Sequence, residues 1–443
     1  MQNYKKNFLI QKKVVNLLFK KNMKKLLFIN VFITIFFNCI FAQDTIKVMS
    51  YNLLNFGNYT GYCNVSNNND TVKTEYLRTI IEDQKPDILA VCELHPDKKY
   101  TINILGKVLN KNGLKWSRRN PTNFSHSDLV NCLFFDSTKF SCDAGMAIKT
   151  VYRDINIYKL KHLKSGTNFH VIIAHLKAGN TSTDANSRAA MTDSLMKYLK
   201  IYPDNTNNFM IVGDFNVYNA NEVAFQNLIN PTNTEIAFYD PINQIGNWHN
   251  NSAYKKYFTQ STSTDNGNNC KAPGGFDDRF DFILISSSIK NGTKNMKYQN
   301  DSYEAVGQDG NRFNQSLINP INNTRQSEVI DALSNMSDHL PIVAKFIFDG
   351  TSNITSQSIN SQFVVTFENQ ITDKIDYQIK IDYPQKLDVA LYSIDGRKVN
   401  ETTIFAEQNG RYSINTTNLK SGIYILSFNG ENVFQSYRIN VFK

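Results

Sequence analysis

Six short apolar stretches set the strongest limit on how this 443-residue chain can fold. Each is nearly continuous in hydrophobic side chains, and they lie at residues 45–54, 87–94, 169–176, 209–215, 280–286 and 340–348. A strand that is apolar on both faces must be covered on both sides. The pattern therefore predicts sheets covered by helices, which is an α/β fold.

The segments between these strands supply the helices. Residues 72–82 place apolar side chains on one face of a helix, and Pro86 ends it. Residues 184–200 repeat the pattern with Met191, Leu195 and Leu199. At this length one hydrophobic core is not expected, so we predict two domains.

The first 42 residues predict a targeting segment. From Met23, two lysines precede an apolar run that ends at Ala42, which is the layout of a secretory signal peptide cleaved before Gln43. Met23 would then be the true first residue. A membrane anchor is the alternative, but the run is short and no charged residues follow it directly.

This leader also accounts for the basic composition. The chain has 48 basic and 39 acidic residues, a formal net charge of +9. Eight of the lysines and none of the acids lie in residues 1–42, so subtracting them leaves 40 basic residues against 39 acidic ones. The overall charge of the mature chain therefore gives no indication of nucleic-acid binding.

Five cysteines follow the leader, and export permits disulfides among them. Cys92 lies inside an apolar strand and is predicted to be a buried thiol. Cys132 with Cys142 is the predicted local bridge, and Cys63 with Cys270 is a long-range alternative. No cysteine spacing resembles a zinc site.

Composition changes after Phe348. Residues 349–372 are polar and rich in Ser and Asn, which predicts a linker. Residues 373–443 contain short alternating strands separated by turns, which predicts a small all-β sandwich. The expected domains are therefore a leader at 1–42, a larger α/β domain at 43–348 and this terminal sandwich.

Each apolar strand of the first region ends in polar residues that packing alone does not require. In chain order they are Asn52, Glu93, His175, Asp214, Asn216, Asp278, Asp281, Asp338 and His339. Strand ends gathered at one edge of a sheet are a usual place for a functional site.

These residue types fit one task. Glu93, Asp338 and the amide of Asn52 are oxygen ligands that suit Mg²⁺, Mn²⁺ or Ca²⁺. The two histidines can exchange protons with an attacking water and a leaving alkoxide. Asp214 can orient the water, a histidine or the surroundings of a phosphate, and Asn216 can donate to a phosphate oxygen. Metal-assisted hydrolysis of a phosphate ester needs these functions.

The motifs "YNLLNF", "ILAVCEL", "AHLKAG", "VGDFN", "DDRFDFIL" and "SDHLPI", in this order, resemble the endonuclease/exonuclease/phosphatase superfamily, the deoxyribonuclease I-like enzymes. The resemblance spans about residues 45–348. It implies a four-layered α/β/β/α sandwich, with two sheets face to face and helices outside.

The resemblance also implies a role for each motif residue. Asn52, Glu93 and Asp338 fall on metal-binding positions, and His339 and His175 fall on a base and an acid. Asp214 and Asn216 fall on positions that orient water and phosphate, and Arg153 lies near phosphate contacts. Asp278 and Asp281 are alternative partners for a histidine, and the spacing does not choose between them.

For function, the resemblance implies a secreted, metal-dependent phosphodiesterase, an endonuclease acting on DNA or on RNA. A phosphatase or a phospholipid phosphodiesterase is the alternative within the superfamily, and a non-catalytic binding protein is the alternative outside it. The other histidines, His95, His126, His162, His170 and His249, are interpreted as structural, and the Arg118–Arg119 pair as a solvated face.

The tail resembles the sorting domain of type IX secretion, on the evidence of "YSIDGRKV" (392–399), "LKSGIYILSF" (419–428) and the basic terminus at Lys443. This implies that the secretion machinery is a partner. It also implies a location outside a Gram-negative cell, with no stable membrane insertion after the leader is cleaved.

Overall fold

The computed structural model describes residues 43–349, apart from 114, 203–206 and 266–269, and residues 363–443, apart from 368–369, 382–383 and 431–433. The predicted leader and residues 350–362 of the predicted linker lie outside these ranges. The chain divides into two compact units, residues 1–351 and residues 352–443. Among the described residues, no helix combines the length and the apolar character needed to cross a membrane.

Two mixed sheets form the centre of the first unit. Within its described residues, one sheet has the order β11-β13-β1-β2-β4-β3, with β12 also paired to β13, and the other has the order β5-β6-β7-β8-β10-β9. The first contains β1 (Asp44–Phe56), β2 (Ile88–Leu94), β3 (Trp116–Arg118), β4 (Val130–Asp136), β11 (Met296–Tyr298), β12 (Glu304–Ala305) and β13 (Ile342–Phe348). The second contains β5 (Phe140–Ile148), β6 (Ile155–His162), β7 (Asn168–Ile173), β8 (Phe209–Asp214), β9 (Phe238–Tyr239) and β10 (Asp281–Ser286).

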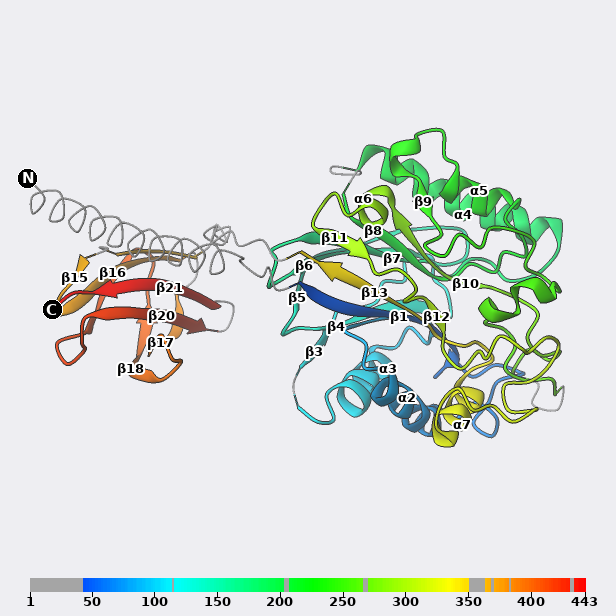
Figure 1. Ribbon diagram of the computed structural model, residues 1–443, viewed down its shortest axis with the longest axis horizontal. Helices are drawn as coiled ribbons and strands as arrows, with labels where there is room; N and C mark the ends of the chain where they lie inside the picture. Colours follow the sequence, from blue (N-terminus) through cyan, green and yellow to red (C-terminus); the bar gives the residue numbers. More distant parts are fainter. Residues whose placement is uncertain are drawn as a thin grey trace, which may run out of the picture. The chain divides into compact units, whose positions relative to one another are not determined.

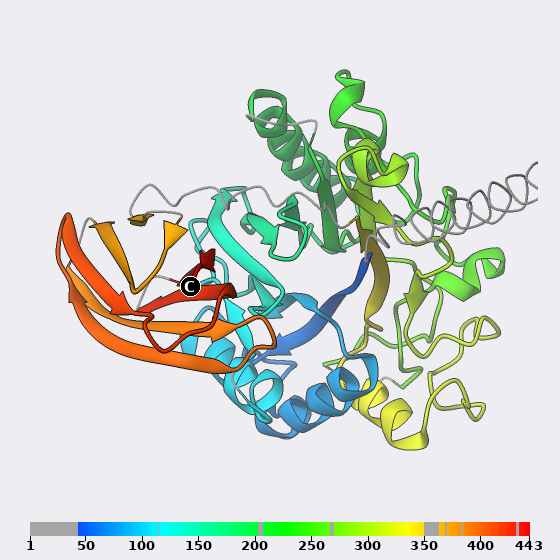
Figure 2. The same ribbon diagram turned by 60° about the vertical axis from the view of Figure 1, so that its left-hand side comes forward.

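Helices cover the outer face of each sheet. Figure 1 and Figure 2 both place α2, α3 and α7 beside the first sheet, and α4 and α5 beside the second. Their bounds, with that of α6, are α2 (Asp70–Gln84), α3 (Lys98–Asn103), α4 (Ser182–Ile201), α5 (Val223–Ile229), α6 (Ser287–Asn291) and α7 (Ser327–Met336). A π-helical turn follows α3 at Ile104–Leu109, and 3-10 turns lie at Thr234–Ile236 and Ser252–Tyr257.

Three separate apolar clusters show that this is a four-layered sandwich, as expected. One lies between the first sheet and its helices, one lies between the two sheets, and one lies between the second sheet and its helices. Val48 and Val212, for example, both point into the central cluster, whereas Met49 and Ile211 point outward to the helices. Because both faces of each sheet are buried, the strands are apolar throughout.

Local capping sets the ends of the predicted helices. The side chain of Asn69 accepts hydrogen bonds from the backbone of Thr71 and Val72 at the start of α2. Lys85, in a left-handed conformation before Pro86, ends the same helix. At the start of α4, Thr181 and Asp184 form a reciprocal capping box.

The second unit is a small all-β structure. Its described strands form one sheet in the order β14-β16-β19 and another in the order β15-β21-β20-β17-β18. They are β14 (Phe363–Phe367), β15 (Gln370–Ile371), β16 (Lys374–Ile381), β17 (Gln385–Ser393), β18 (Lys398–Ala406), β19 (Gly410–Asn415), β20 (Gly422–Gly430) and β21 (Phe434–Val441). A cluster that includes Ile379, Leu387, Leu426 and Phe428 forms its core.

The cysteine pairing differs from the expected local bridge. Cys63 and Cys270 form a disulfide across 207 residues of sequence, and Cys132 and Cys142 do not bond to each other. Those two cysteines lie on β4 and β5, which belong to different sheets, and Cys132 packs toward the helices while Cys142 packs toward the central cluster. Cys92 is a buried thiol, as predicted.

We expect the disulfide to stabilise the first unit. Replacing Cys63 and Cys270 together by alanine should lower the free energy of unfolding by about 2–4 kcal/mol, because the crosslink restricts the unfolded chain. Denaturant melts of the two proteins measure the difference. Dithiothreitol should reduce the stability of the wild-type protein and leave the double variant unchanged; equal sensitivity in both would contradict the assignment.

Candidate active site

The site begins where parallel strands of both sheets end. β1 runs parallel to β2, and β7 runs parallel to β8, so each pair delivers its carboxyl ends to one edge. Asn52 lies near the end of β1, Glu93 near the end of β2 and Asp214 at the end of β8. The Asn52 amide nitrogen donates to Glu93 Oε1 at 2.8 Å and to Asp214 Oδ2 at 3.0 Å. One side chain therefore joins both sheets at this edge.

The backbone at the site adopts conformations that most residues avoid. Glu93 and Asn216 have φ angles of 61° and 50°, in the left-handed region. Such strain in residues other than glycine concentrates at functional sites. Gly213, just before Asp214, has φ 132°, and a Cβ atom there would lie 2.1 Å from the carbonyl oxygen of Ala174. Only glycine lets β8 approach β7 this closely.

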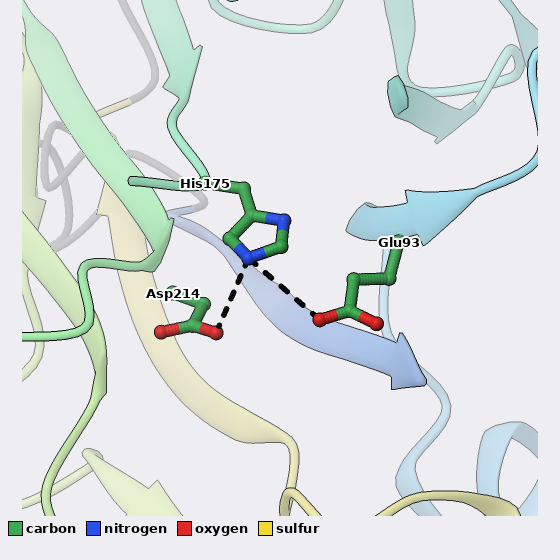
Figure 3. A group of neighbouring side chains, drawn as sticks. All are labelled: Glu93, His175 and Asp214. Atoms are coloured by element: carbon green, nitrogen blue, oxygen red, sulfur yellow. Dashed lines mark ion pairs between the residues drawn. The ribbon is translucent and has the colours of Figure 1, made fainter. Parts of the chain in front are cut away.

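His175 faces the two carboxylates (Figure 3). Its Nε2 atom lies 3.7 Å from Glu93 Oε1 and 3.7 Å from Asp214 Oδ2. Burial lowers the pKa of His175 well below its ordinary value, and the positive charges of Arg153 and His339 lower it further. The imidazole is therefore neutral at physiological pH. Neutral imidazole is the form that can ligate a metal ion or accept a proton.

Asp214 occupies the middle of the site. Its Oδ2 atom lies 3.7 Å from Nε2 of His339 as well as from Nε2 of His175. Burial raises the pKa of Asp214 to about 7, with contributions from the Asp281 and Glu93 charges, although His339 and the Asn52 hydrogen bond oppose the shift. A carboxylate with this pKa is a much stronger base than an ordinary aspartate.

His339 has the opposite electrostatics from His175. Its Nδ1 atom lies 2.7 Å from Asp281 Oδ2, in a buried ion pair. Burial alone would lower the pKa of His339, but the carboxylates of Asp281 and Asp214 outweigh it and hold the pKa well above the ordinary value. The two histidines of the site therefore carry different charges at neutral pH.

Asp278 and Asp281, the two candidate partners in the "DDRFD" motif, pair with different histidines. Asp281 pairs with His339, whereas Asp278 Oδ1 lies 2.8 Å from Nδ1 of His249. Burial raises the pKa of Asp278 to about 6, as does the nearby charge of Asp277, and its hydrogen bond with His249 opposes the shift. The sequence indicates a structural role for His249, because "WHNN" contains no signal that distinguishes it from an ordinary loop residue.

Gln260 is a second residue that sequence reasoning missed. Its side-chain amide lies 2.8 Å from Nε2 of His339 and 3.3 Å from Asp338 Oδ2. Its backbone forms isolated bridges with both Asp278 and His339. Gln260 thus connects the two histidine–aspartate pairs. No motif marks it, since an isolated glutamine in a polar loop has no spacing to interpret.

Arg153 and Asn216 border the site from the side of β7. Arg153 donates to the carbonyl oxygens of His175 and Leu176, at 3.5 and 3.0 Å. The Asn216 amide donates to the carbonyl of Leu176 at 3.3 Å, and its backbone N–H donates to Asp214 Oδ1 at 3.0 Å. Both side chains are therefore held beside the Glu93–His175–Asp214 group.

The donor set fits a divalent cation. Glu93, His175 and Asp214 each offer a ligand atom within 4.8 Å of the others. Asp338 has one buried oxygen, Oδ1, that makes no hydrogen bond within the described part of the chain, while its Oδ2 accepts from Gln260 and from the backbone of Ala272. The Asn52 oxygen accepts from the backbone of Leu54, so Asn52 turns its amide nitrogen toward the carboxylates.

Comparison with solved structures finds similar chains at low sequence identity. The catalytic domain of human Nocturnin with a bound sulfate anion is 17% identical, over 70% of this chain and 98% of that one, with a TM-score of 0.44. D. rerio TDP2, humanized by 14 mutations, is 17% identical over 68% and 98% of the two chains, with a TM-score of 0.43. An endonuclease/exonuclease/phosphatase family protein from Bacteroides thetaiotaomicron is 14% identical, over 69% of this chain and 99% of that one, with a TM-score of 0.45. No curated protein matches the sequence.

Two family patterns match the sequence itself. Residues 367–441 match the secretion system C-terminal sorting domain. This tail implies interaction with the type IX secretion system and therefore a secreted or cell-surface protein of a Gram-negative bacterium. Residues 49–292, more than half of the chain, match the endonuclease/exonuclease/phosphatase family, whose members are hydrolases of phosphoester bonds that generally depend on a divalent metal ion. The chain belongs to the endonuclease/exonuclease/phosphatase family.

Proposed function

We propose that this protein is a secreted, metal-dependent phosphodiesterase that cleaves DNA. The observation that carries the proposal is the group of Glu93, His175 and Asp214 beside the His339–Asp281 ion pair. The group offers cation ligands, a strong carboxylate base and a positive charge within one buried edge of the sandwich. Hydrolysis of a phosphodiester needs these elements and no covalent intermediate.

We assign Glu93 and His175, whose ligand atoms lie within 4.8 Å of each other, to hold the cation, and we assign Asp338 as a further ligand because its buried Oδ1 makes no hydrogen bond to a described residue. When bound, the cation neutralises charge on the phosphate and on the leaving oxygen. Glu93 is fixed for this task, because Asn52 and the backbone N–H of Asn55 each donate to one of its oxygens. Asp338 is held through one oxygen, because the side chain of Gln260 and the backbone N–H of Ala272 both donate to its Oδ2.

The electrostatics favour Asp214 as the group that removes a proton from the attacking water. A pKa of about 7 gives it the required basicity near neutral pH. His339, which holds its proton, is better suited to stabilise negative charge on the phosphate than to act as the base. Neutral His175 is correspondingly better suited as a ligand or acceptor than as the acid. Asn216 and Arg153 are assigned to orient the phosphate oxygens.

Plasmid nicking tests the reaction class. We expect the wild-type protein to nick supercoiled DNA with Mg²⁺ and to lose this activity in EDTA. His175→Ala should lower the rate by at least ~100-fold, because it removes the neutral imidazole that we assign as a ligand or proton acceptor, and a positioned proton-transfer group contributes on this scale. His126→Asn, at an exposed loop position with φ 53°, is the matched control and should retain full activity. If DNA is untouched while inositol phosphates or sphingomyelin are hydrolysed, the substrate assignment is wrong.

The His339–Asp281 pair can be tested by titration. In Asp281→Asn, burial is no longer offset by that carboxylate, so the pKa of His339 should fall relative to wild type. The raised pKa stabilises the wild-type fold below the unfolded-state value of about 6.5, and this contribution is lost as pH rises through the folded-state pKa. The variant, which keeps only the Asp214 charge, should show a weaker pH dependence of stability. Imidazole NMR titration measures the shift, and Asp278→Asn, which leaves the His339–Asp281 pair in place, is the control and should change the pKa of His339 less.

The secretion tail gives a separate prediction. Deleting residues 373–443 should keep the protein out of the culture medium, because the sorting domain would no longer engage the secretion system. Immunoblots of medium and cell fractions measure the distribution. Unchanged export of the truncated chain would remove the sorting role while leaving the catalytic proposal intact.

A further inference from the structure

Arg118 and Arg119 do not form the solvated face that the sequence suggested. Both are only partly exposed, and both line a cavity of about 290 Å³. The cavity lies between the edge of one sheet, at β3, and the edge of the other, at β5 and β6, because Gly145 and Tyr158 complete its wall. We call this cavity the arginine pocket.

Neither arginine has a carboxylate partner among the described residues. Arg118 donates to the Asn120 side chain at 2.8 Å and to the carbonyl of Arg119 at 3.4 Å. Arg119 donates to the carbonyl of Asp143 at 3.3 Å. The Nε atom of Arg118 is buried and, within the same part of the chain, makes no hydrogen bond. The pocket therefore holds two positive charges that the protein itself does not neutralise.

Tyr158 adds a third unused donor. Its side chain is only 2% exposed, and its hydroxyl makes no hydrogen bond to any described residue. Burial raises the pKa of this hydroxyl well above its ordinary value, so it keeps its proton, and the charges of Arg118 and Arg119 are close enough to oppose the shift. A buried donor of this kind usually has a partner.

Gly145 packs closely against the wall of the pocket. A Cβ atom at this position would lie 3.3 Å from Cδ1 of Tyr158, which is a tight contact, and 3.8 Å from Nε of Arg119. The cavity therefore has several donors around it, and a larger side chain at residue 145 would press against two of the residues that line it. A phosphate group, with its charge and several acceptor oxygens, is the ligand class that satisfies two guanidinium groups and a hydroxyl together.

The arginine pocket adjoins the candidate active site through a short chain of hydrogen bonds. Asn156, which lines the pocket, accepts from Asn131 at 3.0 Å, and Asn131 also donates to the carbonyl of Ile173, two residues before His175. Thr122, another lining residue, donates to Asp154 at 2.7 Å, next to Arg153. These contacts tie the pocket to the strand and the loop that carry His175 and Arg153.

We propose that the arginine pocket binds a non-scissile phosphate of a polynucleotide strand whose scissile phosphate lies at Glu93, His175 and Asp214. This rests on the proposed function and narrows it, since a substrate with a single phosphate cannot use the second position. The pocket would favour polynucleotides over small phosphate esters through binding, without taking part in the chemical step.

Steady-state kinetics on two substrates tests the proposal. Arg118→Met and Arg119→Met should each raise the KM for a short DNA oligonucleotide about tenfold, leave kcat near the wild-type value, and leave hydrolysis of bis(p-nitrophenyl) phosphate unchanged. Each should also reduce the slope of log affinity against log salt by about 0.7–0.9, the loss of one phosphate contact. Lys111→Met, which removes an exposed charge from the loop before β3, is the control and should leave the kinetics on both substrates unchanged.

A second variant covers the case in which an arginine variant fails to fold. Gly145→Val keeps both arginines and fills the pocket, and it should raise the oligonucleotide KM in the same way. Unchanged oligonucleotide kinetics, or an equal loss of activity on the small diester, would overturn the proposal that the arginine pocket binds a non-scissile phosphate. If the wild-type protein cleaves no DNA, the proposed function fails. The fluorescence anisotropy of a labelled oligonucleotide in EDTA then tests phosphate binding by the arginine pocket separately. Equal oligonucleotide affinity of wild type and Arg119→Met would reject that binding.

Discussion

The contact between the Asn52 amide and the carboxylates of Glu93 and Asp214 is the interaction on which the rest of the site depends. These two carboxylates come from different sheets, and Asp214 is buried. Without a donor between them, their negative charges would repel across the edge of the sandwich. Hydrogen bonds to charged groups contribute about 1.5–3 kcal/mol each, so a single neutral side chain can hold this arrangement in the free protein. It also fixes the distance from Glu93 and Asp214 to His175.

The two histidines on either side of this contact differ in charge. On one side, burial and neighbouring positive charges keep His175 neutral. On the other, Asp281 and Asp214 hold a proton on His339. Asp214 lies between the two imidazoles, and burial together with the charges of Asp281 and Glu93 makes it more basic than an exposed aspartate, although the His339 charge opposes this. The same two residue types, histidine and aspartate, are thereby suited to different parts of one hydrolytic reaction.

The residues around the site also differ between its two sides. Gln260 connects the His339–Asp281 pair to the His249–Asp278 pair, and His249 is partly open to solvent. On the opposite side, Arg153 joins the site to the loop that leads toward the arginine pocket. A long polyanionic substrate would meet uncompensated positive charge there and carboxylates with a cation at the centre. For a protein that carries a secretion tail, such a substrate would be encountered outside the cell.

The amino-acid sequence by itself determined the family, the α/β class and the strand ends that carry polar residues. It could do so because these are local properties: in "VGDFN" an apolar run is followed at once by Asp214 at the strand end, and this order can be read without knowing what the strand packs against. Only the tertiary structure decided which groups meet. It paired Asp281 with His339 and Asp278 with His249, and it placed Gln260 against the site. It also joined Cys63 to Cys270 and placed Arg118 and Arg119 in the wall of a cavity. Pairing and protonation depend on burial and on the distances between residues that are far apart in the chain. The spacing of residues along the sequence gives neither of these quantities.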